Sequence, residues 1–124
     1  MYLGSYTSEG GKGVGVGTLD PATGTLTVDH WVPGLTDPSG LDLAPDGRTL
    51  YAVSERDPTG TVSPLPLDGT GNPTVHNGQK TGAGPAHVRV HPNGKVLFTA
   101  DYDGGSVGVY PLGGAGTISP RARP

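Results

Sequence analysis

The chain has 124 residues, a formal net charge of −3, no cysteine, 23 glycines and 13 prolines. The weakly acidic balance argues against a nucleic-acid-binding surface, and the lack of cysteine excludes disulfides and thiolate metal sites. No apolar run approaches the roughly 20 residues that a membrane-spanning helix needs. Glycine and proline stand mostly at the ends of short apolar runs, which favours turn-rich β structure.

The first predicted strand covers residues 1–7 (MYLGSYT), and a glycine-rich turn follows at 8–13. Residues 14–19 form the next strand, and a turn at 20–24 leads to an outer strand that contains Leu26, Val28 and Trp31. A loop at 34–38 then enters the next unit. We expect essentially no helix, because no segment carries a long apolar pattern with a 3.6-residue period.

The second unit contains four predicted strands, near residues 39–44, 48–54, 61–67 and 73–77. The third contains strands near 86–90, 95–101 and 106–112, with a fourth that starts near Thr117. Asn93-Gly94 fits the tight turn between two of these strands, because both residues tolerate a positive φ.

These units repeat one another. Residues 38–51 (PSGLDLAPDGRTLY) align with residues 85–98 (PAHVRVHPNGKVLF) at an offset of 47, and VSPLPL at 62–67 aligns with VGVYPL at 107–112 at an offset of 45. A period of roughly 40–50 residues with several strands in each is typical of β-propeller blades. The predicted fold class is therefore all-β: a β-propeller fragment of about two and a half to three blades of four-stranded antiparallel sheet.

The predicted blades are residues 1–33, which lack a first strand, residues 34–80, and residues 81–124, which are incomplete. Propellers typically close with 4–8 blades. We therefore expect either an incomplete piece of a larger protein or several copies that assemble to close the ring. The expected partners are the remaining blades or further copies of the chain, with no nucleic acid and no membrane. The sequence leaves a cytoplasmic and a secreted location both open.

Strand geometry predicts where polar side chains gather. The first two strands of a blade are antiparallel, so 86–87 should neighbour 101–102, and 39–40 should neighbour 54–56. The first strand lines the central channel of a propeller, so His87 is expected near its mouth. The predicted catalytic residues are His87, Glu55 and Tyr102, and the predicted substrate-binding residues are Arg56 and Asp101. No cofactor is expected, and Asp37, Asp42 and Asp57 are too dispersed to form a calcium cage.

Each of these residues also has a purely structural interpretation. His87 can cap a strand, and Glu55 with Arg56 can form a solvated ion pair. Tyr102 can be a packing residue, and Asp101 can bond backbone amides of the next turn.

Four segments resemble one family: MYLGSYTSEGGKG, LDPATGTLT, PSGLDLAPDGRTLYAVSE and GAGPAHVRVHPNGKVLFTADYDGGSVGVYPL. They are similar to the lactonase family of seven-bladed propellers, which includes the bacterial propeller-type 6-phosphogluconolactonase and the fungal carboxy-muconate cyclase. The resemblance covers nearly the whole chain but about the first third of a typical member. This sequence departs from the family by lacking an aromatic residue at 14–19, by Asp101 where asparagine is more frequent, and by Pro64 within a strand.

The resemblance implies that the protein hydrolyses a small-molecule lactone, namely a sugar-acid lactone like 6-phosphogluconolactone. A histidine or carboxylate suits the activation of water, and an arginine or tyrosine hydroxyl suits the oxyanion of the tetrahedral intermediate. The family's site is assembled from several blades, so this piece alone is expected to be inactive. The alternative is a non-catalytic propeller fragment that acts as a binding or self-assembling structural module.

Overall fold

The computed structural model describes residues 1–55 and 59–123. Within these ranges, ten strands form three antiparallel sheets, in the orders β1-β2-β3, β4-β5-β6-β7 and β10-β9-β8. The strands are β1 (Tyr2–Leu3), β2 (Val14–Asp20), β3 (Thr25–Val32), β4 (Gly40–Leu43), β5 (Thr49–Ser54), β6 (Thr61–Pro66), β7 (Gln79–Lys80), β8 (Pro85–Val90), β9 (Val96–Asp101) and β10 (Ser106–Pro111). Only two single-turn 3₁₀ helices occur in the described part, η1 (Thr7–Glu9) and η2 (Gly114–Gly116). The predicted propeller fragment is confirmed.

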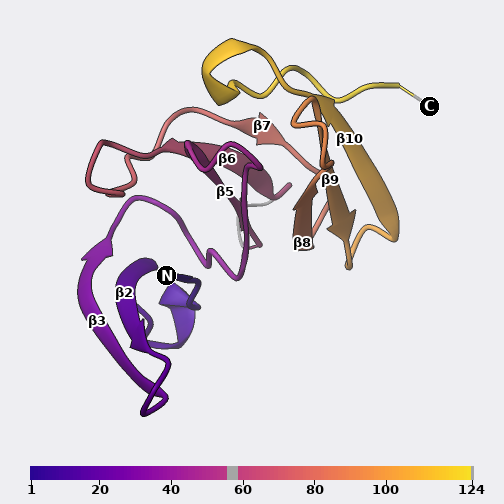
Figure 1. Ribbon diagram of the computed structural model, residues 1–124. Helices are drawn as coiled ribbons and strands as arrows, with labels where there is room; N and C mark the ends of the chain where they lie inside the picture. Colours follow the sequence, from indigo (N-terminus) through magenta and orange to yellow (C-terminus); the bar gives the residue numbers. More distant parts are fainter. Residues whose placement is uncertain (56–58, 124) are drawn as a thin grey trace.

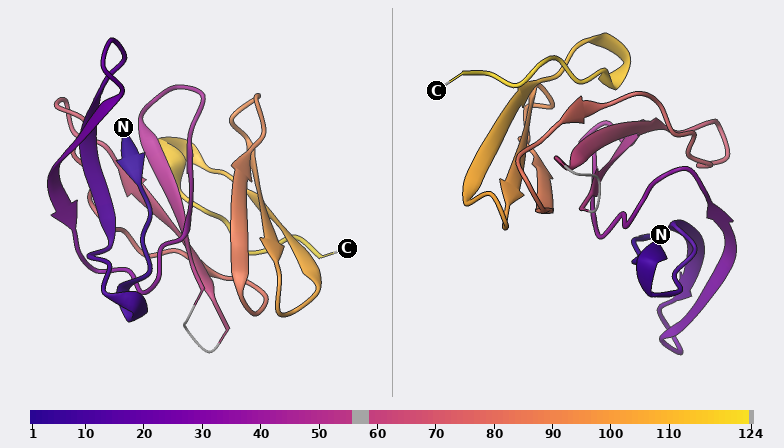
Figure 2. Two further views of the ribbon diagram at one scale, coloured as in Figure 1. Left: turned by 90° about the horizontal axis from the view of Figure 1, so that it is seen from below. Right: turned by 180° about the vertical axis from the view of Figure 1, so that it is seen from behind.

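The sheets stand side by side as successive sectors of an arc, in chain order (Figure 1). We call them blade 1 (β1–β3), blade 2 (β4–β7) and blade 3 (β8–β10). Seen from below, the tight turns that follow β2, β4 and β8 gather at one end of the blades, and η1 and the loop after β9 lie at the other (Figure 2, left). No helix in the described ranges is long and apolar enough to cross a membrane.

Turn chemistry repeats from blade to blade. Gly24, Gly47 and Gly94 each adopt φ of 72°, a left-handed conformation that glycine takes without steric cost. Their N–H groups bond the carbonyl groups of Asp20, Ala44 and His91. The hairpins after β4 and β8 therefore close in the same way, with a bond to the third residue before the glycine, whereas the bond in the hairpin after β2 reaches the fourth residue before it. Each turn fixes the register of the strands that it joins.

The core lies between blades, and β5 supplies both of its faces. Every residue of β5 is buried. Leu50 and Ala52 pack with Val14 towards blade 1, whereas Tyr51 and Val53 belong to the cluster shared with blade 3. Because side chains alternate across a strand, one continuous apolar run serves two neighbours.

Blades 2 and 3 approach closely where β4 meets β8. A Cβ atom added at Gly40 would lie 2.9 Å from Val53 Cγ2 and 3.3 Å from the carbonyl oxygen of Ala86. A larger residue would require the Val53 side chain and the Ala86 carbonyl group to shift, so glycine at this position permits the close approach of the two strands.

A tryptophan compensates for the missing aromatic residue of β2. A Cβ atom on Gly15 would lie 3.0 Å from Cζ3 of Trp31, so the indole ring covers the glycine from the adjacent strand β3. The bare backbone of β2 thus makes room for a large side chain that the next strand supplies.

Two predicted strands differ in extent. The first ends at Leu3 and gives way to η1, whereas a strand was predicted over residues 1–7. The outer strand of blade 2, predicted over residues 73–77, is instead a bridge at Pro73 followed by β7 at 79–80. Pro64 and Pro66 of β6 accept hydrogen bonds from the N–H groups of His76 and Thr74 but have no N–H to return. The hydrogen bonds between β6 and this outer segment therefore run in one direction only, from the outer segment to β6, and the ladder is incomplete.

Candidate active site

Glu55 lies at the end of β5 and is held by two hydroxyl groups from different segments. Ser39, just before β4, donates to Glu55 Oε1 at 2.5 Å. The hydroxyl of Tyr6, from blade 1, lies 3.0 Å from both carboxylate oxygens. This Tyr6–Ser39–Glu55 cluster fixes the orientation of a carboxylate at the end of the blades opposite the tight turns.

Tyr6 is coupled to this carboxylate. Its side chain is 41% exposed, and the hydrogen bond to Glu55 raises the pKa of Tyr6 above its ordinary value near 10. The cause is that a phenolate could not donate to the carboxylate and would be repelled by it. Tyr6 therefore keeps its proton, and with it the hydrogen bond, throughout the physiological range.

Tyr6 and Ser39 were not among the predicted site residues. The repeat does contain the signal for Tyr6, because residues 1–7 align with the strands that end at Glu55 and Tyr102. Sequence register shows that these positions are equivalent within their own blades. It does not show that equivalent positions of adjacent blades touch, which depends on how the blades are twisted relative to each other.

His87 lies on β8 and is exposed. The pairing of β8 with β9 shifts between Pro85 and His87, so the strand is irregular where this side chain projects. The Cα of His87 would be 3.5 Å from a Cβ on Gly40, the residue that follows Ser39. The structure thus brings His87 beside the segment that holds Glu55.

Asp101 occupies a different environment, with its side chain fully buried. Its carboxylate accepts hydrogen bonds from the Gly82 N–H at 3.0 Å, Thr99 Oγ1 at 2.9 Å and Ser106 Oγ at 2.9 Å. Arg121 Nη2 lies 3.9 Å away. These contacts favour the structural interpretation, in which Asp101 ties the loop before β8 to β9 and β10. A role in substrate binding stays a prediction.

Tyr102 follows Asp101 and is 83% exposed. Its N–H donates to the carbonyl oxygen of Gly84 at 2.8 Å, while its ring projects from blade 3. It holds the position in blade 3 that Glu55 holds in blade 2, at the offset of 47. The predicted substrate-binding residue Arg56 lies outside the described residues.

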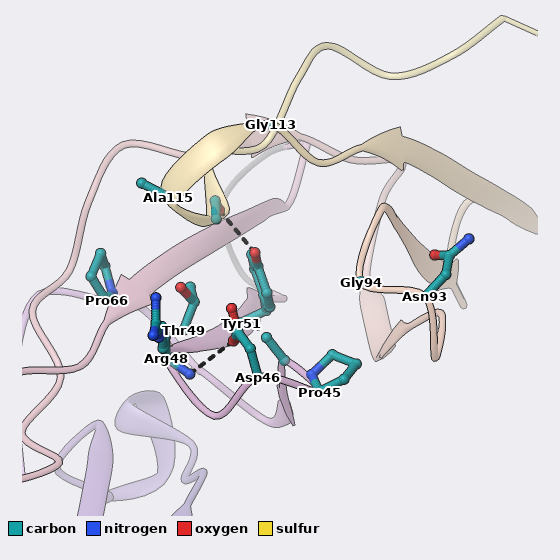
Figure 3. Close-up of a pocket in the computed structure, with 12 residues that line it drawn as sticks. Pro45, Asp46, Arg48, Thr49, Tyr51, Pro66, Asn93, Gly94, Gly113 and Ala115 are labelled. Atoms are coloured by element: carbon teal, nitrogen blue, oxygen red, sulfur yellow. Dashed lines mark hydrogen bonds between the residues drawn. The ribbon is translucent and has the colours of Figure 1, made fainter.

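A cavity of about 520 Å³ lies at the opposite end, between the tight turns of blades 2 and 3 and the loop around η2 (Figure 3). Several of its polar groups are hydrogen-bonded to one another. Asp46 Oδ1 accepts a hydrogen bond from the backbone N–H of Arg48, and the Tyr51 hydroxyl donates to the carbonyl oxygen of Gly116. It contains none of the predicted site residues. Its size alone gives no chemistry comparable to the Glu55 carboxylate that two hydroxyl groups hold.

The residues described here contain no group of three or more histidines and carboxylates able to hold a metal ion.

Radially arranged antiparallel sheets of three or four strands, with tight turns at one end and a polar cluster at the other, define a β-propeller. The chain belongs to the lactonase family of seven-bladed β-propellers, since the family model "Lactonase, 7-bladed beta-propeller" matches residues 1–123.

Three relatives illustrate the similarity. A 6-phosphogluconolactonase of Bacillus subtilis is 29% identical over 119 residues, which is 94% of this chain and 34% of the relative. The crystal structure of a putative 6-phosphogluconolactonase from Bacteroides uniformis is 36% identical with a TM-score of 0.88, and the match covers 98% of this chain and 36% of that one. The periplasmic gluconolactonase of Pseudomonas aeruginosa is 28% identical with a TM-score of 0.86, over 98% of this chain and 37% of that one.

The chain spans about a third of the length of these relatives. It is a lactonase-type propeller region.

Proposed function

We propose that the protein containing this chain hydrolyses a sugar-acid lactone of the 6-phosphogluconolactone type, with His87 and the Tyr6–Ser39–Glu55 cluster in its site. The observation that carries this proposal is the Glu55 carboxylate, held by two hydroxyl groups in a segment to which the backbone of the exposed residue His87 lies close. The names of the relatives support the reaction class.

In the proposed reaction His87 accepts a proton from water while the water oxygen attacks the lactone carbonyl carbon. The negative charge on the former carbonyl oxygen is stabilised by a hydroxyl donor, a role that we assign to Tyr102. The ring C–O bond then breaks, and the departing oxygen takes the proton from the imidazolium. One water is consumed, and the product is a hydroxy acid.

We assign to Glu55 the stabilisation of the positive charge on the His87 imidazolium that forms during the reaction. A carboxylate fixed by two donors needs little reorganisation when charge develops next to it, which is the condition for effective electrostatic stabilisation. Arg56 is proposed to bind a phosphate or carboxylate of the substrate, because its guanidinium matches such groups bidentately.

The test is hydrolysis of 6-phosphogluconolactone and gluconolactone by the protein with all of its blades, measured above the spontaneous rate. We expect His87→Ala to lower kcat by 10²- to 10⁴-fold, the usual contribution of a general base. His30→Ala is the matched control, because His30 is an exposed histidine on β3 of blade 1.

Unchanged kcat in the His87→Ala variant would remove His87 from the mechanism. Spontaneous rates for both lactones with the wild-type protein would overturn the proposed function.

A second candidate is a binding or self-assembling module, with further blades or further copies of the chain as its partners. The observation that favours it is the outward side of blade 3, where Val107 is 63% exposed on β10. A native mass equal to a multiple of the chain mass would support self-association. A soluble monomer of 12.5 kDa at high protein concentration would count against it.

A further inference from the structure

A second polar cavity, of about 270 Å³, has none of the proposed catalytic residues among its described lining residues, although its residue Ser54 directly precedes Glu55. It is lined by the end of β5, the start of β6, the loop at 34–36 and the segment at 75–78. All of these lie within residues 34–78, in blade 2 and the loop that enters it.

One buried hydroxyl in this cavity has no partner. Ser54 is 2% exposed, and its Oγ makes no hydrogen bond anywhere in the described chain. Buried polar groups in folded proteins are almost always hydrogen-bonded, and leaving one unpaired is unfavourable. An unpaired hydroxyl that lines a cavity marks a place where a bound molecule can supply the missing bond.

The sheet face around Ser54 changes from apolar to polar at this point. Further along the same face of β5 and β6, Leu50, Ala52 and Leu65 pack against blade 1. Ser54 pairs with Thr61, and Ser63 pairs with Ala52, so three hydroxyl side chains stand where the apolar face would continue. These hydroxyls interrupt the core instead of extending it.

A β-bulge opens the sheet beside Ser63. Val62 pairs with Gln79, and Pro64 accepts a hydrogen bond from His76, so Asn77 and Gly78 together stand opposite Ser63. A Cβ atom on Gly78 would collide with the backbone of Val62, which explains the glycine. Bulges of this kind redirect side chains, and here His76 and Asn77 line the cavity.

The chemistry of the lining residues indicates the ligand class. Hydroxyl, imidazole and carboxamide groups both donate and accept hydrogen bonds, and Leu35 and Val75 add apolar contact. Within the described ranges the lining residues include no lysine, arginine, aspartate or glutamate, so none of these residues would compensate the charge of an ion. We propose that this cavity is a binding site for a neutral polyol of triose to hexose size, with Ser54 as its buried anchor.

The probes are glycerol, D-xylose and D-glucose, added to the protein containing this chain and followed by amide NMR shifts. We expect saturable shifts confined to residues 34–36, 54, 61–63 and 75–78. Thermal stability is not used as evidence of binding, because polyols raise Tm through exclusion from protein surfaces.

Ser54→Ala separates a ligand-binding role from a structural one. We expect its apparent affinity for the probe to fall at least tenfold while its Tm without polyol stays equal to wild type or rises, because no protein bond is lost. Thr23→Ala, in the exposed turn at 20–24, is the control and should bind the probe like wild type.

Three results would overturn the proposal. They are the absence of saturable local shifts with all three polyols, a clear drop in the Tm of Ser54→Ala without polyol, and local shifts caused by inorganic phosphate but by none of the polyols. The catalytic assay plays no part in this test, so it stands or falls independently of the lactonase proposal.

Discussion

The carboxylate of Asp42 on β4 accepts a 2.7 Å hydrogen bond from the backbone N–H of Val90 on β8. Arg89 of β8 lies 3.8 Å from the other carboxylate oxygen. A side chain of one blade thus completes the backbone bonding of the next, at the edge strands where the two sheets meet. The contact sets the position of β8, and therefore of His87, relative to β4 and Ser39.

We predict that Asp42→Ala destabilises the protein by about 2 kcal/mol, because it removes a charge-assisted hydrogen bond and leaves a backbone N–H unpaired. Lactone hydrolysis should fall as well, since His87 is no longer held in register. Urea unfolding measures the first effect and initial rates the second. Asp42→Asn keeps an acceptor oxygen and should recover most of the stability; equal losses in both variants would contradict the argument.

The Tyr6–Glu55 hydrogen bond predicts a pH dependence. The pKa of Tyr6 is raised in the folded protein, so its contribution to stability is fully present below pH 10 and is lost as the pH rises through the folded pKa. In Glu55→Gln the pKa of Tyr6 should return towards 10. NMR titration of the Tyr6 ring, assigned with Tyr6→Phe, measures the shift. The same Tyr6 pKa in wild type and Glu55→Gln would show that the bond does not form in solution.

The hydrogen bonds of Asp68 predict that the stability of its turn depends on pH in the acidic range. Hydrogen bonds from Asn72 and Thr70 to its carboxylate lower its pKa from 3.8 to about 2. This stabilising contribution is present above pH 3.8 and is lost as the pH falls towards 2. The same turn presents the Gly71 carbonyl oxygen to the Tyr2 hydroxyl of blade 1 at 2.7 Å.

Protonation of Asp68 should therefore loosen this contact between blades 1 and 2. Carboxyl NMR titration gives the pKa directly, and Asp68→Ala should lose the acid transition of the turn. A titration midpoint near 3.8 in the wild-type protein would contradict the turn geometry.

For Asp101 the structure predicts a loss of stability rather than of substrate affinity. Asp101→Ala leaves the Gly82 N–H and two hydroxyls without their acceptor, and we expect about 3 kcal/mol of destabilisation. Under conditions where the variant is folded, KM for the lactone should be unchanged. A raised KM with normal stability would instead support the predicted substrate contact.

The sequence was sufficient for the sheets because their signals are local. Turn glycines such as Gly47 and Gly94 and the alternating apolar positions fix each hairpin without reference to the rest of the chain. The outer strand of blade 2 was misplaced because its pairing depends on the neighbouring strand, where Pro64 and Pro66 supply no N–H groups.

The site was only partly predictable for a related reason. The proximity of Glu55 and Ser39 follows from pairing within one blade, and that much the register does predict. The contact with Tyr6 comes from the adjacent blade, and the burial of Asp101 depends on which side of β9 meets the preceding loop. Both depend on packing between blades, which leaves little trace in the local pattern of residues.

The one-directional bonding of β6 to the outer segment of blade 2 has a dynamic consequence. Opening residues 73–77 breaks few reciprocal bonds, whereas opening β5 exposes the apolar core on both of its sides. Amide hydrogen exchange should therefore be fast at the periphery of blade 2 and slow at β5. The outer margin of the blade can fluctuate while the Glu55 carboxylate, directly after β5, keeps its position, so local motion at the periphery is separated from the proposed site within a single sheet.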